Sequence, residues 1–221
     1  MKKMKTRIII FLLMFFGITF DNGVVVSAQD KKTDKNISSK NKVLVPDLKD
    51  WPQASQKAAR EIMDKYGVPS EVTKDMLIWN NNGIWLKTIV YKEEVKHNFP
   101  SPHTDVVEQW INYGMLPDKF DPLAKFDGSI TTNRTNGTIS SRCDREAMNF
   151  LALNLAHEIV MGVKSVTQAR FDYATQAQEF NKGEKPSYTQ KLIFNSDKSA
   201  PDPDRAYDLE MKIGMDGTDG K

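Results

Sequence analysis

The chain has 221 residues, of which 27% are charged and 39% hydrophobic, and its formal net charge is +2. The first 28 residues hold four basic residues and one acidic residue, a net charge of +3, so the rest of the chain carries about −1. This balance excludes the clustered positive charge that nucleic-acid-binding proteins need. The single cysteine, Cys143, excludes an intramolecular disulfide.

The N-terminus has the pattern of a secretory signal peptide over residues 1–28. Four basic residues precede the apolar run Ile8–Phe20, and Val26 and Ala28 occupy the small-residue positions before Gln29. The alternative is an uncleaved anchor, but this run is shorter than the roughly 20 residues that cross a bilayer. We therefore predict cleavage before Gln29, export to the periplasm or the extracellular space, and no stable membrane anchor afterwards.

Composition divides the rest of the chain into three parts. Residues 29–42 are polar and lack apolar periodicity, so we predict a disordered tether. Residues 196–221 are rich in acidic residues and are broken by prolines and glycines, which predicts a disordered acidic tail. Residues 43–195 have the length and the apolar content of a single domain.

The domain begins with a predicted helix in "DWPQASQKAAREIMDKYGVP". Asp50 and Gln53 have the spacing of a capping box, and Gly67 suits the left-handed position after the last turn. The apolar residues recur at i, i+3, i+4 and i+7, the spacing of one buried helix face. They are Ala59, Ile62, Met63 and Tyr66.

Two β-hairpins are predicted from Asn-Gly turns between runs of β-branched and aromatic residues. The first lies in "MLIWNNNGIWLKTIVYK", where Trp79 and Trp85 flank the turn and are expected to pack against the helix. The second lies in "GSITTNRTNGTISSRC". Between the hairpins, "TDVVEQWINY" predicts a short helix or a strand.

The C-terminal part of the domain predicts two helices. "DREAMNFLALNLAHEIVMG" is apolar on most sides, as expected for a helix at the centre of the core. "SVTQARFDYATQAQEFNKG" begins at a capping box formed by Ser165 and Gln168, and "YTQKLIF" predicts an edge strand. The sequence thus predicts an α+β fold, with an antiparallel sheet built from hairpins and packed against an N-terminal helix and a C-terminal antiparallel helix pair.

The candidate metal ligands are His97, His103, Asp105 and His157. The first three lie in or beside "HNFPSPHTD", with Glu108 a further carboxylate nearby, and His157 lies on the long helix. Imidazole and carboxylate ligands suit zinc or iron, and three protein ligands would leave a position for water. The spacing matches no dedicated ligand motif.

Each of these residues also has an interpretation without a metal. Pro100 and Pro102 stiffen the loop, and His103 or Thr104 can cap the element that follows. His157 lies beside an apolar helix face, where a histidine is usually buried and hydrogen-bonded. Cys143 near a helix start could act as a nucleophile with a histidine, although neighbouring acidic residues oppose thiolate formation.

Three stretches, "WPQASQKAAREIMDKYGVPSEVT", "VYKEEVKHNFPSPHTDVVEQ" and "RCDREAMNFLALNLAHEIVMG", resemble those of a family of small exported bacterial proteins. The resemblance covers the chain between Leu48 and Phe194. It implies these domain limits and a bacterial envelope address, and it assigns no activity and no site residue.

Two classes of function follow from these observations. The first is a non-catalytic envelope protein that binds a small ligand or a partner protein and needs no cofactor. The alternative is a metal-binding protein or metal-dependent hydrolase that uses His97, His103 and His157. Convergence of the histidine nitrogens on one point would distinguish the second class from the first.

Overall fold

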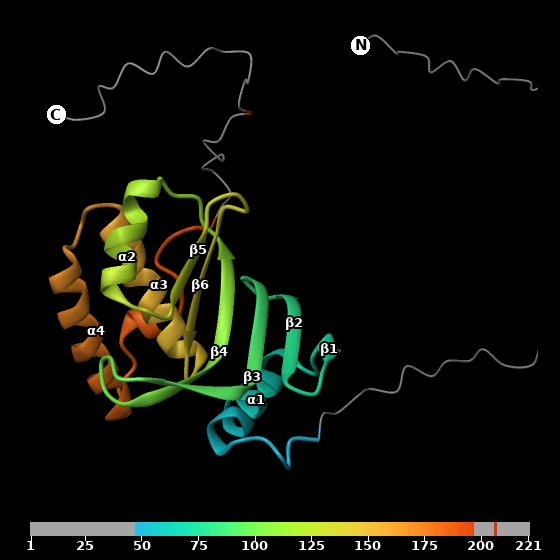
Figure 1. Cartoon of the computed structure of the whole chain (residues 1–221). Helices are drawn as coiled ribbons and strands as arrows, with labels where there is room; N and C mark the ends of the chain where they lie inside the picture. The colour runs from blue at the N-terminus through green and yellow to red at the C-terminus, as the bar shows by residue number, and fades with distance from the viewer. Residues whose placement is uncertain (1–46, 197–205, 207–221) are drawn as a thin grey trace, which may run out of the picture. The chain divides into compact units, whose positions relative to one another are not determined.

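The computed structural model describes residues 47–196 and residue 206. The predicted signal peptide, the predicted tether and all but two residues of the predicted acidic tail lie outside the described residues. The elements follow one another as one helix, four strands, a second helix, two strands and two helices, with two short 3₁₀ turns (Figure 1).

One antiparallel sheet has the strand order β1-β2-β3-β4-β6-β5. Both predicted hairpins are confirmed, and in the first of them Asn81 and Gly83 adopt the positive φ values of 51° and 69° that the turn requires. The strands are β1 (Glu71–Val72), β2 (Met76–Asn82), β3 (Trp85–His97), β4 (His103–Asn112), β5 (Ile130–Asn133) and β6 (Thr138–Cys143).

Four α-helices accompany the sheet: α1 (Gln53–Tyr66), α2 (Phe120–Phe126), α3 (Glu146–Val160) and α4 (Val166–Asn181). Val107 on β4 packs against α1, while Gln109 on the same strand bonds to α3. Because residues two apart on a strand share a face, α1 and α3 cover the same face of the sheet. Helix α4 packs against α3 and α2. The predicted α+β fold with an antiparallel sheet is confirmed.

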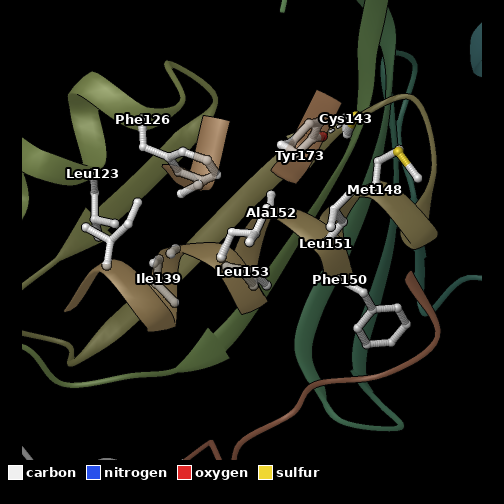
Figure 2. Packing of buried hydrophobic residues seen from close by; sticks show 14 of the residues in the cluster. Leu123, Phe126, Ile139, Cys143, Met148, Phe150, Leu151, Ala152, Leu153 and Tyr173 are labelled. Carbon is white, nitrogen blue, oxygen red and sulfur yellow. Dashed lines mark hydrogen bonds between the residues drawn. The ribbon is translucent and has the colours of Figure 1, made fainter. Parts of the chain in front are cut away.

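Helix α3 lies at the centre of the larger hydrophobic cluster, as its all-round apolar sequence predicts. Figure 2 shows Phe150, Leu151 and Leu153 of α3 among side chains from β6, α2 and α4. The two buried asparagines of the helix are hydrogen-bonded. Asn149 donates to the Val107 carbonyl and to Gln109, and Asn154 donates to two carbonyls of the 188–191 segment.

Two local predictions are wrong, one about the start of helix α1 and one about an edge strand. Helix α1 begins at Gln53 after Pro52, without a side-chain cap, so Asp50 and Gln53 form no capping box. "YTQKLIF" forms no strand, because its carbonyl groups at Tyr188 and Lys191 accept hydrogen bonds from Asn154 instead of pairing with the sheet. The capping box of Ser165 and Gln168 at the start of α4 is confirmed.

Within residues 47–196 and at residue 206, the structure has no helix whose length and hydropathy would allow it to cross a membrane.

Candidate metal centre

The β3–β4 hairpin brings the two neighbouring histidines together. "TDVVEQWINY" belongs to strand β4, which begins at His103, so this histidine pairs directly with His97 across the hairpin and caps no helix. Paired residues project to the same face of a sheet, and the imidazole centroids are 5.0 Å apart. Asp105 lies two residues beyond His103 and therefore shares that face.

Asp105 turns one carboxylate oxygen toward each histidine. His103 Nε2 lies 3.0 Å from Asp105 Oδ1, and His97 Nδ1 lies 3.4 Å from Asp105 Oδ2. One potential ligand atom from each of the three residues falls within 4.8 Å of the others. Three of the four predicted ligands thus meet at one point of the hairpin.

The second nitrogen of each imidazole faces an oxygen outside this group. His103 Nδ1 is 2.8 Å from the Ser101 carbonyl oxygen, so Nδ1 carries the proton that is donated there. His97 Nε2 lies 3.8 Å from Asp127 Oδ1. His103 Nε2 is therefore free to hold a cation, and His97 Nδ1 faces both Asp105 and the Ser129 hydroxyl, whose oxygen lies 3.3 Å away.

Burial makes the negative charges of Asp105 and Asp127 energetically unfavourable. Asp105 is only 2% exposed and Asp127 only 4%. Desolvation raises the pKa of Asp127, and the nearby Asp105 carboxylate acts in the same direction, against the Ser129 amide and the two histidines. The ion pairs that the described residues offer to Asp105 and Asp127 run to His97 and His103.

Asp105 Oδ1 has no aligned hydrogen-bond donor within the described part of the chain. Its nearest contact is His103 Nε2, which is a bare lone pair whenever the proton sits on Nδ1. Asp105 Oδ2, by contrast, accepts a hydrogen bond from the Ser129 hydroxyl. Burial would lower the pKa of His103, but Asp105 and the Ser101 carbonyl outweigh it and raise the pKa. The two facing acceptors require a proton or a metal ion between them.

Cys143 borders the site from β6. Its Sγ is 3.5 Å from His103 Nε2, and both side chains line a cleft of about 170 Å³ between the 100–102 loop, the start of α3 and α4. Desolvation, with Asp144 and Asp105, raises the pKa of the Cys143 thiol well above its ordinary value. A buried neutral thiol is a poor nucleophile, so this geometry does not favour the cysteine–histidine hypothesis.

The structure does not bring His157 or Glu108 to the hairpin site. His157 Nδ1 lies 2.8 Å from the Tyr113 hydroxyl, and its ring stacks on Phe194 at 4.2 Å. Glu108 lies an odd number of residues from Asp105, so it projects to the opposite face of β4 and accepts a hydrogen bond from Tyr91.

Sequence reasoning missed Asp127 and Ser129. They follow α2 and reach the hairpin only through the tertiary fold, and the "FDGS" sequence around them resembles an ordinary turn. The pairing of Asp127 with the following Ser129 amide is a local turn contact, which gives no sign of the histidine on the other side.

Comparisons of the chain with protein-family models, with curated proteins and with solved structures find no match.

Proposed function

We propose that this chain is an exported metal-binding protein that holds one divalent transition-metal ion, best zinc, through His97, His103 and Asp105. The observation that carries the proposal is the convergence of two imidazoles on a carboxylate that is 98% buried. Export depends on residues 1–28, which lie outside the described residues, and it is part of the proposal.

The separations between ligand atoms support zinc. In a tetrahedral site with the usual Zn–N and Zn–O bond lengths, neighbouring nitrogen and oxygen ligands lie roughly 3.3–3.5 Å apart. Two different oxygens of Asp105 lie near the histidines, Oδ1 at 3.0 Å from His103 Nε2 and Oδ2 at 3.4 Å from His97 Nδ1. A carboxylate that gives one oxygen to zinc binds through only one of these atoms, so the three side chains, whose ligand atoms lie within 4.8 Å of one another, must adjust when an ion enters.

The outer contacts of the histidines support the same proposal. A metal-bound histidine nearly always gives its other ring proton to a carbonyl or a carboxylate, which fixes the tautomer and orients the ring. His103 has the Ser101 carbonyl in this role, and the Asp127 carboxylate faces His97 Nε2 at 3.8 Å, which is longer than a hydrogen bond. The His103 ring thus presents Nε2 to Asp105, and His97 presents Nδ1, which also lies 3.3 Å from the Ser129 hydroxyl oxygen.

The alternative to a metal ion between His103 Nε2 and Asp105 Oδ1 is a proton, and measuring the bound metal distinguishes the two. The test uses residues 29–221, purified without a polyhistidine tag and without chelators, and measures bound metal by mass spectrometry. We expect close to one equivalent of zinc per chain. Asp105→Asn keeps the shape of the side chain and His103→Ala removes one ligand, and each should abolish binding.

His157→Gln is the matched control, because it removes a histidine that lies outside the site. Its metal content should equal that of the unaltered protein. Absence of metal in the purified protein, together with no uptake during titration with zinc, would overturn the proposal. Equal loss of metal in the His157→Gln variant would also contradict it, since the ligand set would then be a different one.

A further inference from the structure

Cys143 is placed as a metal ligand would be placed, although it belongs to none of the predicted ligand sets. Its residue is 4% exposed and ends strand β6, where it pairs with Val107 of β4. The Sγ atom lies nearer to His103 Nε2, at 3.5 Å, than to Asp144 Oδ1 at 3.7 Å or the Tyr173 hydroxyl at 3.8 Å.

The sulfur–nitrogen distance agrees with shared coordination. With Zn–S about 2.3 Å and Zn–N about 2.0–2.1 Å, tetrahedral geometry places the two ligand atoms roughly 3.5–3.6 Å apart. His103 Nε2 therefore has Cys143 Sγ at a distance suited to one edge of a coordination tetrahedron and Asp105 Oδ1 close by at 3.0 Å. Cys143 Sγ does not lie within 4.8 Å of all three other ligand atoms, so its side chain must move toward them when an ion binds.

A second, independent observation points to an ion at this place. Asp105 Oδ1 lacks an aligned donor although its residue is 98% buried, and its 3.0 Å contact with His103 Nε2 joins two acceptors when that imidazole is neutral, which is costly without a cation between them. Asp105 Oδ1 and the Cys143 thiol both lie next to the same imidazole nitrogen, His103 Nε2. A lone buried cysteine alone would not indicate a site, but these contacts together do.

We propose that Cys143 is the fourth ligand, so that the proposed metal is held by two histidines, one aspartate and one thiolate. This inference rests on the proposed metal-binding function. On binding, the S–H bond breaks, a metal–sulfur bond forms, and the proton leaves to solvent; no oxidant or reductant takes part. The thiolate gives up its weak contacts with Asp144 and Tyr173.

The fourth ligand decides what kind of metal protein this is. Four protein ligands close a tetrahedral site, as in structural zinc centres, whereas catalytic zinc keeps one position for water or substrate. With Cys143 bound, the ion ties β3, β4 and β6 together and has no position for an attacking water. The protein then holds or senses metal, and hydrolysis is not its activity.

Cobalt substitution tests the proposal on the untagged protein under reducing, oxygen-free conditions. A thiolate bound to cobalt(II) gives an intense charge-transfer absorption in the near ultraviolet, which imidazole and carboxylate ligands do not give. We expect this band, together with visible absorption of tetrahedral strength, at one equivalent of cobalt. In Cys143→Ser the near-ultraviolet band should vanish while cobalt still binds at saturating concentration.

Zinc affinity of the Cys143→Ser variant should fall by roughly 100-fold or more, because loss of an outer-shell partner alone costs roughly 10–100-fold. If the variant does not fold, the spectrum of the unaltered protein decides the question by itself. One equivalent of bound cobalt without the charge-transfer band would overturn the cysteine ligand and leave the proposed function standing. No binding of cobalt or zinc at all would overturn both.

Discussion

Asp127 faces the far side of His97 and so tests the site without touching the proposed ion. Its Oδ1 lies 3.8 Å from His97 Nε2, and its carboxylate also accepts the Ser129 amide proton at 2.9 Å. Burial raises its pKa, which means that its negative charge destabilises the fold in the absence of a cation. Asparagine would keep the acceptor oxygen and remove that charge.

We therefore expect Asp127→Asn to weaken zinc binding by roughly 10–100-fold without lowering the stability of the metal-free protein. A competition titration against a chromogenic chelator measures the affinity, and urea unfolding measures the stability. Asp121→Asn, at an exposed position of α2, is the control and should change neither. Unchanged affinity in Asp127→Asn would show that His97 does not use this carboxylate as its partner.

Glu146 is a partly buried carboxylate of a different kind, because each of its oxygens has a hydrogen-bond donor. It accepts hydrogen bonds from Lys65 and Tyr66 of α1, from Trp85 of β3 and from Gln109 of β4. Burial would raise its pKa, but these four donors outweigh burial and lower it. One side chain thereby connects α3 with the helix and strands of the smaller hydrophobic cluster.

Glu146→Gln should cost about 1.5–3 kcal/mol at neutral pH, as expected for a lost charged hydrogen-bond partner. Because the folded pKa lies below the ordinary value of 4.5, the contribution is full above 4.5 and is lost as the pH falls through the folded value. Urea unfolding across this range should show a smaller loss of stability with acid in the variant. Glu94→Gln, which is exposed on β3, should behave as the unaltered protein. The argument would be refuted if Glu146→Gln lost stability with acid as steeply as the unaltered protein does.

At the scale of elements, the turn of the first hairpin is fixed by the positive φ of Gly83 and by the neighbouring ring of Tyr66. Gly83 has φ of +69°, and a Cβ placed there would lie 3.2 Å from Tyr66 Cε1. Tyr66 donates to Glu146 at 2.6 Å, so the ring has little freedom to move away. A side chain at position 83 therefore meets backbone strain and crowding together.

Gly83→Ala should destabilise the protein by at least about 1–2 kcal/mol, the cost of the left-handed conformation for an ordinary residue. Thermal or urea unfolding measures it. Gly128→Ala is the matched control, because nothing lies within 4 Å of its added Cβ and its φ is not in the strained range. Equal stability of the two variants would show that the turn relaxes freely.

The elements that were predicted correctly from the sequence are those specified by short local patterns of residues. Asn-Gly turns specify the hairpins, and the Ser165 capping box specifies the start of α4. Helix α2 was not predicted; it has only seven residues, too few to show a clear apolar period, and it contains Pro122. The failed strand at "YTQKLIF" has strand-like composition, but no pattern in it indicates that Asn154 takes its carbonyl groups.

At the scale of the whole molecule, the candidate site combines one local and two distant contributions. Spacing in the sequence suggested His97, His103 and Asp105, and the hairpin register explains why they meet. Asp127 and Cys143 arrive from other elements, the α2–β5 connection and β6. No periodicity relates such segments, so their approach follows only from the packing of the complete fold.

A metal ion at this meeting point should stabilise the whole domain, because its ligands come from strands that must be assembled before they converge. Zinc at about 100 times its Kd would add about 2.7 kcal/mol to the free energy of unfolding. For a domain of this size, that corresponds to a rise in Tm of roughly 5–11 °C.

Calorimetry of the metal-free protein with and without zinc measures the shift. His157→Gln should show the same rise and His103→Ala none, since only the latter lacks a ligand. An equal rise in His103→Ala would place the stabilising ion elsewhere in the molecule.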